Sequence, residues 1–309
     1  MDKVGGGLAA IGNTPLVRLG PLVPQGAAEV WVKLEGGNPT GSYKDRMAVS
    51  VLTAALERGD IAPGDTIVEF TGGSTGTALA FVSAVLGMKF TAVFSDAFSQ
   101  SKQQAMEAFG AAVLIEKCVD GAITHELAER MKKRAYALAE QPGHYYADQF
   151  GSPDVRRGYA PMGEEIATTL DGKLDVFCAG VGTGAAMMGT LDGLRANGLN
   201  PKVIALEPTE SQLLTTGASG AHNVEGIAVF PEPPFLERAA IAEVRTVDQS
   251  RAFEMCRRLA REEGIFGGGS TGLNVTAAIE LAVELGDGHR VVTLGCDNGA
   301  KYLGGHIYS

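Results

Sequence analysis

The sequence predicts an α/β fold made of two three-layer α/β domains with largely parallel sheets. Two observations lead to this prediction. Short apolar or β-branched runs alternate with amphipathic helical stretches along the chain, and the 42 glycines cluster at the junctions between them. Alternation of this kind is typical of parallel strands that are covered by helices on both faces.

The strands are expected where β-branched and aromatic residues form runs of about five to eight residues. These runs are residues 29–36, 66–70, 89–95, 111–116, 174–180, 202–208 and 290–295. Each is followed by a turn that is rich in glycine or serine, and then by a stretch with helical periodicity.

The first helix is expected at residues 44–58, where an amphipathic stretch ends at Gly59, a residue suited to close a helix. The other helical stretches follow the same pattern of apolar residues spaced three and four apart. They are residues 77–87, 99–110, 123–140, 181–198, 249–264 and 274–286. The range 181–198 includes the glycine-rich turn before its helix.

Two runs of strands and helices, before and after the loop "HYYADQFGSPD", predict two domains with a cleft between them. The smaller domain is residues 41–146. The larger domain is residues 1–40 together with residues 147–309. Neither run contains an internal repeat or a low-complexity segment.

Composition excludes several classes of function. The net charge of −10 and the isoelectric point of about 5.1 argue against a nucleic acid or an anionic membrane surface as the partner. No run is apolar enough to span a membrane, and the N-terminus has no secretory signal. The four cysteines are widely spaced, as free thiols in a reducing compartment are, and the five histidines show no metal-ligand spacing. We therefore expect a cytoplasmic protein without a metal site.

Lys44 stands in "NPTGSYKDRMA", at the start of the first predicted helix. A lysine there is most often solvated. The positive end of the helix dipole disfavours a second cation, however, and a buried lysine at that place has a lowered pKa. Only the neutral amine attacks a carbonyl, so Lys44 is a candidate to form a Schiff base.

Two glycine-rich turns are candidate anion sites, since each joins a strand to the N-terminus of a helix. The first is "TGGSTG" at residues 71–76, which could also be only a tight turn with a hydroxyl cap. The second is "GVGTGAAMMG" at residues 180–189. The second also matches the dinucleotide fingerprint G-x-G-x-x-A, and Glu207 stands where a ribose-binding acid would lie. A nicotinamide-dependent dehydrogenase is thus a rival interpretation, but it leaves Lys44 and the first turn unexplained.

A third glycine-rich turn, "GIFGGGSTG", places Ser270 and Thr271 at the start of a helix, where a neutral hydroxyl could face a ring nitrogen. In order along the chain, these motifs resemble the cysteine synthase and cystathionine β-synthase family of fold type II pyridoxal-phosphate enzymes, whose fold is tryptophan synthase β-like. The resemblance extends over nearly the whole chain. It is carried by "IGNTPLVRL", "VKLEGGNPTGSYKDRMA", "VEFTGGSTGTALA", "ADQFGSPD", "GVGTGAAMMG", "ALEP", "HNVEGIAV", "LAREEGIFGGGSTG" and "CDNGAKYL".

The resemblance implies roles for individual residues. Lys44 would be the catalytic residue that holds pyridoxal 5′-phosphate as a Schiff base and moves the α-proton. Ser270 would face the pyridine nitrogen and Ser74 the cofactor's 3′-oxygen. The phosphate loop would be Gly182, Thr183, Gly184, Ala185 and Ala186. The substrate carboxylate would bind to Thr71, Gly72, Gly73, Ser74, Thr75 and Gln149.

The resemblance also implies a reaction: β-replacement on a serine-derived amino acid, O-acetylserine or O-phosphoserine with sulfide, through an aminoacrylate intermediate. A small nucleophile and an amino acid are the expected partners, and a homodimer is the expected assembly. A different nucleophile, a serine or threonine dehydratase, and a non-catalytic binding module stay open as alternatives. The family usually has T-S-G-N-T-G where this chain has T-G-G-S-T-G, and Gly-Thr where this chain has Ala185 and Ala186. Gly72 and Ser74 could therefore open space near the substrate carboxylate and alter specificity.

Overall fold

The computed structural model describes residues 5–119, 124–228 and 232–309. Ile123, where the sequence predicts a helix to begin, and Val229, which ends one of the family motifs, lie outside this part of the chain. The chain divides into two compact units, of which the first contains residues up to Ile11 and Lys44–Gly158 and the second contains Gly12–Tyr43 and Tyr159–Ser309. The sequence-based division at 41–146 stays a prediction.

The first unit is built on a four-stranded, fully parallel sheet in the order β5-β4-β3-β6. The middle residues of β3, Ile67, Val68 and Glu69, are completely buried, which is typical of a parallel strand with both faces covered. The strands are β3 (Thr66–Phe70), β4 (Lys89–Ser95), β5 (Ala112–Glu116) and β6 (His144–Tyr146).

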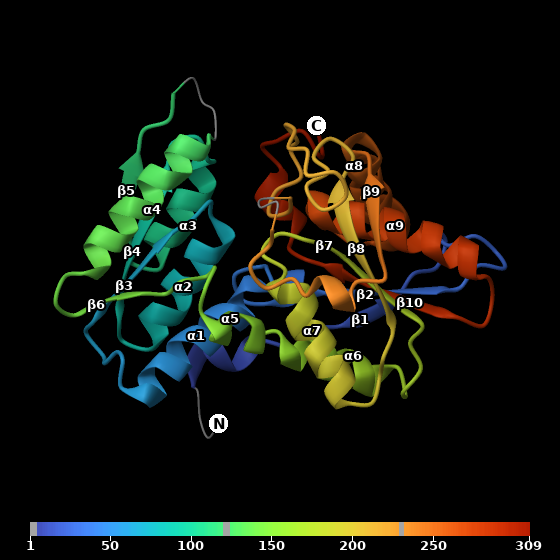
Figure 1. The fold of residues 1–309 in the computed structure, drawn as a ribbon, viewed down its shortest axis with the longest axis horizontal. Helices are drawn as coiled ribbons and strands as arrows, with labels where there is room; N and C mark the ends of the chain where they lie inside the picture. Colours follow the sequence, from blue (N-terminus) through green and yellow to red (C-terminus); the bar gives the residue numbers. More distant parts are fainter. Residues whose placement is uncertain (1–4, 120–123, 229–231) are drawn as a thin grey trace. The chain divides into compact units, whose positions relative to one another are not determined.

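Helices cover the sheet of the first unit on both faces (Figure 1). The helix α4 begins at a threonine cap, since the Thr124 hydroxyl accepts a hydrogen bond from the Leu127 amide. The helices are η1 (Gly6–Ala10), α1 (Lys44–Arg58), α2 (Ser74–Val85), α3 (Gln100–Ala108), α4 (His125–Ala139) and α5 (Pro153–Arg157).

The second unit contains a six-stranded sheet in the order β1-β2-β10-β7-β8-β9. All its pairings are parallel except β1 with β2, which is antiparallel at one edge. The strands are β1 (Leu16–Arg18), β2 (Glu29–Leu34), β7 (Val176–Gly180), β8 (Lys202–Pro208), β9 (Glu243–Val247) and β10 (Arg290–Gly295).

In this unit α6 and α7 lie on one side of the sheet, and α8 and α9 lie on the other (Figure 1). The long helix α9 packs on the buried faces of β2, β7 and β10. The helices are α6 (Ala160–Thr169), α7 (Ala185–Ala196), α8 (Gln249–Arg258), a π-helical turn (Leu259–Glu263) and α9 (Gly269–Leu285), with shorter turns at η2 (Glu35–Gly37), η3 (Arg238–Ala240) and η5 (Gly299–Tyr302).

The predicted fold class is confirmed: both units are layered α/β structures with largely parallel sheets. Seven strands and the main helices lie where the sequence predicts them, within a few residues. The sequence analysis missed the strands β1, β6 and β9, of three to five residues each. It treated His144–Tyr146 as part of a loop, whereas these residues pair with Thr66–Val68 of β3.

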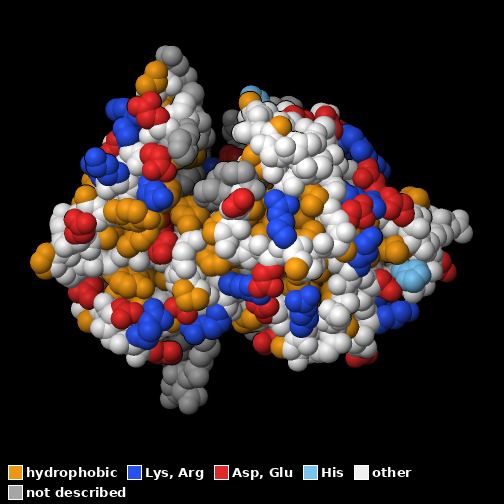
Figure 2. All heavy atoms as spheres, viewed as in Figure 1, with side chains coloured by type: hydrophobic (Ala, Val, Ile, Leu, Met, Phe, Trp, Pro, Cys, Tyr) orange, Lys and Arg blue, Asp and Glu red, His pale blue; other side chains and the backbone are white. Residues whose placement is uncertain are grey.

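Charged side chains of both signs are mixed over the visible surface, with no large area of one sign (Figure 2). Within the described ranges, no helix has the length and apolarity needed to cross a membrane.

Two glycines let α6 and α7 approach closely. A Cβ atom on Gly193 would lie 1.9 Å from the Ala160 carbonyl oxygen, and one on Gly163 would lie 2.1 Å from the Thr190 carbonyl oxygen. Both neighbours are backbone atoms, which cannot rotate away as a side chain can. The two helices can therefore keep this spacing only with glycine at both positions.

We expect Gly193→Ala to lower the free energy of unfolding by about 1–3 kcal/mol, the usual cost of overpacking. Gly304→Ala is the matched control, since no atom lies within 4 Å of a Cβ there; its effect should be within about 0.5 kcal/mol. Urea denaturation of both variants measures the difference. Equal stability of the two variants would contradict the close approach.

Candidate active site

Lys44 is the first residue of α1 and is partly buried. The segment before it is fixed in the second unit. Tyr43 donates its amide hydrogen to the Cys296 carbonyl at 3.1 Å, and Asn298 donates to the Gly41 carbonyl at 2.9 Å. Residues 41–43 therefore lie beside the residues that follow β10, and the next peptide bond leads to Lys44.

The turn at residues 71–76 joins β3 to α2 and is organised by the hydroxyl group of Thr71. This oxygen accepts hydrogen bonds from the amides of Gly73 and Gly76, each at 3.0 Å. Gly73 has φ +138°, a conformation that L side chains rarely adopt. The turn thus gathers backbone N–H groups at the N-terminus of α2 around an oxygen atom, as an anion-binding turn does.

Gln149 lies against this turn and is buried. Its side-chain oxygen accepts a hydrogen bond from the Thr75 hydroxyl at 2.8 Å, and its side-chain amide donates to the Phe70 carbonyl at 2.9 Å. The structure therefore brings Gln149 together with the loop, as the resemblance implies, although the two are more than 70 residues apart in the sequence.

The space next to Gly72 is filled by an aromatic ring. A Cβ on Gly72 would lie 3.1 Å from the ring of Phe98, and a Cβ on Gly73 would lie 2.4 Å from Cδ of Lys102. Gly72 is exposed, but the Phe98 ring lies against the place that a side chain at residue 72 would take, so the effect of Gly72 on the space near the substrate stays a prediction. No local sequence pattern predicts this contact, since Phe98 comes from the loop after β4.

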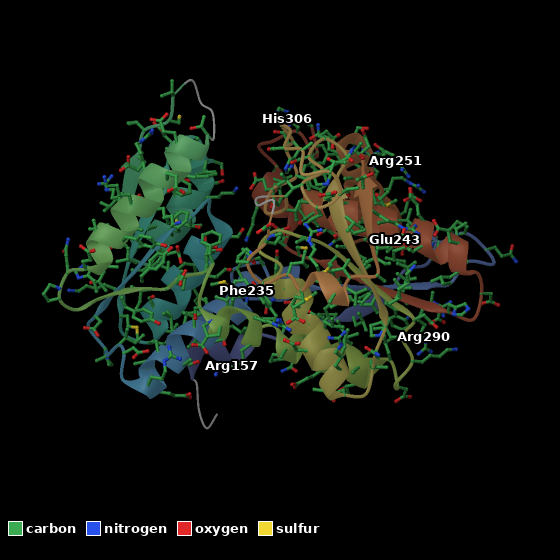
Figure 3. All side chains as sticks on the ribbon, in the orientation of Figure 1. Arg157, Phe235, Glu243, Arg251, Arg290 and His306 are labelled. Carbon is green, nitrogen blue, oxygen red and sulfur yellow. The ribbon has the colours of Figure 1, made fainter. Side chains whose placement is uncertain are left out.

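The turn at residues 181–184 joins β7 to α7 in the second unit. Gly184 has φ +84°, and a Cβ there would lie 2.7 Å from the Leu236 amide nitrogen. A Cβ on Gly182 would lie 2.3 Å from the Gly226 carbonyl oxygen. Phe235, labelled in Figure 3, donates its amide hydrogen to the Thr183 carbonyl at 3.0 Å. Glycine is thus required at both positions, and at the start of α7 the Ala185 amide donates to the Thr183 hydroxyl at 3.3 Å.

Asn274 braces this end of the second unit, and the sequence analysis missed it. Its side-chain oxygen accepts from the Gly180 amide at 2.7 Å, and its side-chain amide donates to the Leu294 carbonyl at 2.8 Å. The residue one turn earlier in α9 is Ser270, which is buried. The ends of β7 and β10 and the start of α9 are therefore held together where the resemblance places the cofactor.

The role considered for Glu207 as a ribose-binding acid is not supported. This buried carboxylate accepts hydrogen bonds from the amides of Leu214 and Thr215, at 2.7 and 3.0 Å, and from the Thr215 hydroxyl. It is used to hold the chain after β8. The dinucleotide interpretation thus loses the residue on which it depended.

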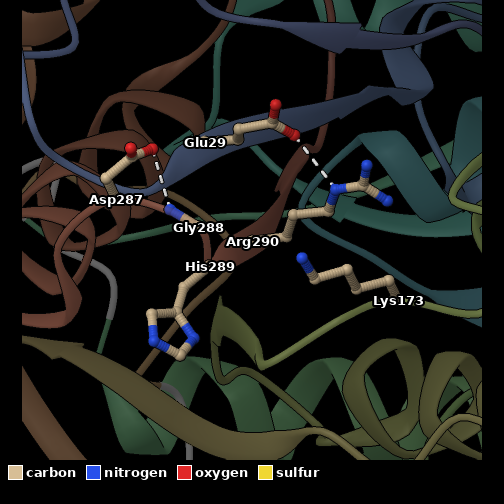
Figure 4. A pocket seen from close by; sticks show the side chains of 6 residues that line it. All are labelled: Glu29, Lys173, Asp287, Gly288, His289 and Arg290. Atoms are coloured by element: carbon tan, nitrogen blue, oxygen red, sulfur yellow. Dashed lines mark hydrogen bonds and ion pairs between the residues drawn. The ribbon is translucent and has the colours of Figure 1, made fainter.

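A small cavity of about 80 Å³ lies at the opposite end of the second sheet, where β2 and β10 begin (Figure 4). Its charged groups pair with protein groups. Arg290 contacts Glu29 at 3.0 Å, and His289 contacts Asp175 at 3.0 Å. It lies at the wrong end of the strands for a parallel-sheet active site. Among the described residues there is also no cluster of side chains suited to a metal ion.

The cysteines do not offer a nucleophile in the second unit's core. Burial raises the pKa of both the Cys178 and the Cys256 thiols to about 12, so both stay protonated near neutral pH. All four cysteines are free thiols.

Comparison with known proteins agrees with this geometry. Residues 8–297 match the family described as "Pyridoxal-phosphate dependent enzyme". The cysteine synthase of Staphylococcus aureus is 38% identical over 97% of this chain and 95% of its own length. The O-ureido-L-serine synthase of Streptomyces lavendulae is 36% identical over 97% of this chain and 91% of its own. The crystal structure of an O-acetylserine dependent cystathionine β-synthase from Helicobacter pylori superposes with a TM-score of 0.90, with 33% identity over the full length of both chains.

The chain belongs to this family of pyridoxal-phosphate dependent enzymes, and its cofactor is pyridoxal 5′-phosphate. The predicted enzyme class and the predicted reaction type, β-replacement on a serine derivative, are confirmed at this level. The residues also fit the cofactor. Gly182 and Gly184 let the turn pack directly against the backbone of Gly226 and Leu236, and the start of α7 that follows this turn is the kind of helix N-terminus that binds a phosphate group.

We expect Asn274→Ala to weaken cofactor binding about tenfold and to lower stability by about 2–4 kcal/mol, because two buried backbone groups lose their partners. Asn197→Ala is the control, since Asn197 donates only to the Gly193 carbonyl at the far end of α7. Titration of the two proteins with pyridoxal phosphate, followed by absorbance, measures the affinities. Unchanged affinity in Asn274→Ala would contradict the brace.

We expect Gly72→Ser to raise the KM for an amino-acid substrate about tenfold, because overpacking against the Phe98 ring typically costs about 1–3 kcal/mol. Adding Phe98→Ala should recover most of that loss, since the ring no longer opposes the new side chain. A double-mutant cycle on KM measures the coupling. Purely additive effects would show that Phe98 and residue 72 are independent.

Proposed function

We propose that the protein is a cysteine synthase, which replaces the β-substituent of O-acetylserine or O-phosphoserine with sulfide. The observation that carries the proposal is the pair of glycine-built N–H turns, one at Thr71–Gly76 and one at 181–184, in a chain that also carries Lys44 at the start of α1. The similarity to the cysteine synthase of Staphylococcus aureus over nearly the full chain supports it.

In this proposal the chain's own residues bind and orient the amino acid. The amides of the Thr71–Gly76 turn, with Thr75 and Gln149, hold the α-carboxylate. The Thr71 hydroxyl now occupies the amides of Gly73 and Gly76, so the carboxylate replaces or joins it there. Several hydrogen bonds to the α-carboxylate hold the amino acid in one orientation. They thereby fix the direction of its Cα–H bond relative to the base, Lys44.

Pyridoxal phosphate, when bound, supplies an electron-accepting ring that stabilises negative charge at the substrate Cα. Lys44 takes the proton from Cα and returns it at the end. Between these steps the β C–O bond breaks and acetate or phosphate leaves, and sulfide then forms the β C–S bond. Ser270, a neutral hydroxyl group, can hydrogen-bond to a ring nitrogen without supplying a proton to it. Gly182, Thr183, Gly184, Ala185 and Ala186 would hold the phosphate of the cofactor, and Ser74 would face its 3′-oxygen.

A β-replacement with a different nucleophile is the second candidate. Ser74 begins α2 and is only partly buried, and its side chain is shorter than the asparagine usual in the family. The similarity to an O-ureido-L-serine synthase supports the same possibility. We also propose that the protein is cytoplasmic and a homodimer; light scattering of the purified protein tests the dimer.

The test of the proposed function is turnover of O-acetylserine, O-phosphoserine and serine by the purified protein, each with sulfide, with other small nucleophiles and with no nucleophile. Cysteine formed from O-acetylserine or O-phosphoserine supports the proposal. Turnover only with another nucleophile would replace it with the second candidate. Release of ammonia and a keto acid without any nucleophile would indicate a dehydratase.

We expect Lys44→Ala to lower kcat at least about 1,000-fold, because the group that moves the α-proton is lost. Borohydride treatment of the wild-type holoenzyme should fix the cofactor on the peptide that contains Lys44, which mass spectrometry detects. Lys89→Ala is the control, since Lys89 is exposed at the amino end of β4. Cofactor fixed on another lysine would refute the assignment.

A further inference from the structure

A buried carboxyl group lies beneath the Thr71–Gly76 turn and has no part in the steps described above. Glu69 is the fourth residue of β3, two residues before Thr71, and its side chain is completely inaccessible to solvent. Acids are rarely buried in this way unless they are paired or fully hydrogen-bonded. The position of Glu69 therefore calls for a physical role.

Glu69 holds the backbone of the residue whose side chain contacts the turn. One carboxyl oxygen accepts the Gln149 amide hydrogen at 2.9 Å, and the other accepts the Phe70 amide hydrogen at 3.0 Å. The Gln149 side chain in turn accepts the Thr75 hydroxyl at 2.8 Å. A continuous line of hydrogen bonds thus leads from Glu69 through Gln149 to the turn.

The backbone around Gln149 needs such support. Asp148, the preceding residue, has φ +53°, in the left-handed region that is uncommon for residues other than glycine. Gly151 leaves room for this arrangement, because a Cβ there would lie 2.4 Å from the Asp148 carboxylate. An unusual backbone conformation persists only where its surroundings hold it. The Glu69 carboxyl group supplies one of these restraints.

The surroundings of Glu69 keep it neutral near pH 7. The pKa of Glu69 is raised to about 8, chiefly by burial and to a smaller degree by the Asp148 charge, against the Gln149 and Phe70 amides and the Tyr146 hydroxyl, which lower it. Within the described residues, the buried Tyr146 hydroxyl has no hydrogen-bond partner by distance and angle. Tyr146 also meets the ring of Tyr136 from α4, edge to face at 4.8 Å between centroids. The titratable groups that act on Glu69 and on Tyr146 of β6 are thus these two residues themselves, Tyr136 of α4 and Asp148.

We propose that Glu69 is a positioning residue for the substrate carboxylate, which fixes Gln149 and, through Gln149, the Thr75 side of the turn. The inference rests on the proposed function in taking an amino acid as the ligand. Ionised Glu69 would place a negative charge directly beneath the site of a carboxylate and weaken its binding. Amino-acid binding should therefore fall as Glu69 ionises.

The first test separates positioning from simple stability. Glu69→Met keeps the approximate size but removes both acceptors; Glu69→Gln keeps a neutral side chain with one acceptor oxygen. We expect Glu69→Met to raise the KM for the amino acid about tenfold, the loss of one buried hydrogen bond, with kcat changed less than about twofold. Glu69→Gln should lie between Glu69→Met and wild type. A fall in kcat with unchanged KM would overturn the proposal.

The second test uses pH and a variant that preserves the core. The wild-type KM for the amino acid should rise above about pH 8, and this rise should be absent in Glu69→Gln, which cannot ionise. Tyr146→Phe removes a hydroxyl that lowers the pKa of Glu69, so the rise should move to higher pH. Tyr145→Phe, the neighbouring residue of β6, is the control and should titrate as wild type. Superimposable profiles for wild type, Glu69→Gln and Tyr146→Phe would refute the role of Glu69.

A third measurement is independent of turnover. The affinity of the holoenzyme for alanine, which has an α-carboxylate but no β-leaving group, can be followed by calorimetry at pH 7 and pH 9. Weaker binding at pH 9 in wild type but not in Glu69→Gln supports the inference, even if no serine derivative is converted and the proposed function fails. Normal cysteine synthesis, with alanine affinities that respond equally to pH in both proteins, would leave the function intact and remove the inference.

The stability of the protein should report the same ionisation. The folded-state pKa of Glu69 is raised above its ordinary value of 4.5, so its contribution to stability is complete below that value and is lost as the pH rises through about 8. Urea unfolding of wild type relative to Glu69→Gln should therefore show wild type losing relative stability from about pH 5 to about pH 8 and no further loss above pH 8. A constant difference across this range would overturn the assignment of Glu69 as the ionising group.

Discussion

The candidate site depends on one constraint: backbone N–H groups must gather where a helix begins after a parallel strand. Apart from β1, which is antiparallel to β2, the strands of each sheet run in one direction, so the helices that follow them begin at the same edge of that sheet. Gly73 in the first unit and Gly184 in the second have positive φ angles. At both positions a Cβ atom would collide with a neighbouring residue. A chain with a net charge of −10 can thus bind anionic groups through amides rather than through an excess of cations.

The same constraint explains which helix boundaries the sequence could predict. The helix α1 was placed correctly, because its amphipathic pattern begins at Lys44 and stops at Gly59. By contrast, α2 begins at Ser74 and α9 at Gly269, three and five residues before the first residue of the predicted apolar periodicity. Small polar residues make up these first turns. They contribute nothing to a hydrophobic stripe, and their function is to present amides.

The site could be predicted from motifs, whereas its supporting residues could not. Lys44, the two glycine turns and Ser270 stand in short segments whose order matches a known family. Phe98 and Asn274 act across the fold, and no local pattern connects them with Gly72 or Gly180. Glu69 did carry a signal, since an acid inside the strand "TIVEF" is out of place in a strand that is buried on both faces. Glu207 was misleading for the same reason: a buried acid marks a set of hydrogen bonds, and sequence alone does not say to which ligand or backbone they lead.

The position of Lys44 follows from where the chain passes between the units. Tyr43 is held by the Cys296 carbonyl, and its ring lies 5.5 Å from that of Tyr159, the residue at which the chain returns to the second unit. Consecutive Cα atoms are about 3.8 Å apart, so the backbone of Lys44 cannot leave the neighbourhood of Tyr43. The Cys296 amide in turn donates a hydrogen bond to the hydroxyl group of Thr271, the residue that follows Ser270. Tyr43, the residue before Lys44, is thereby fixed within the second unit, and Lys44 is the residue at which α1 and the first unit's second segment begin.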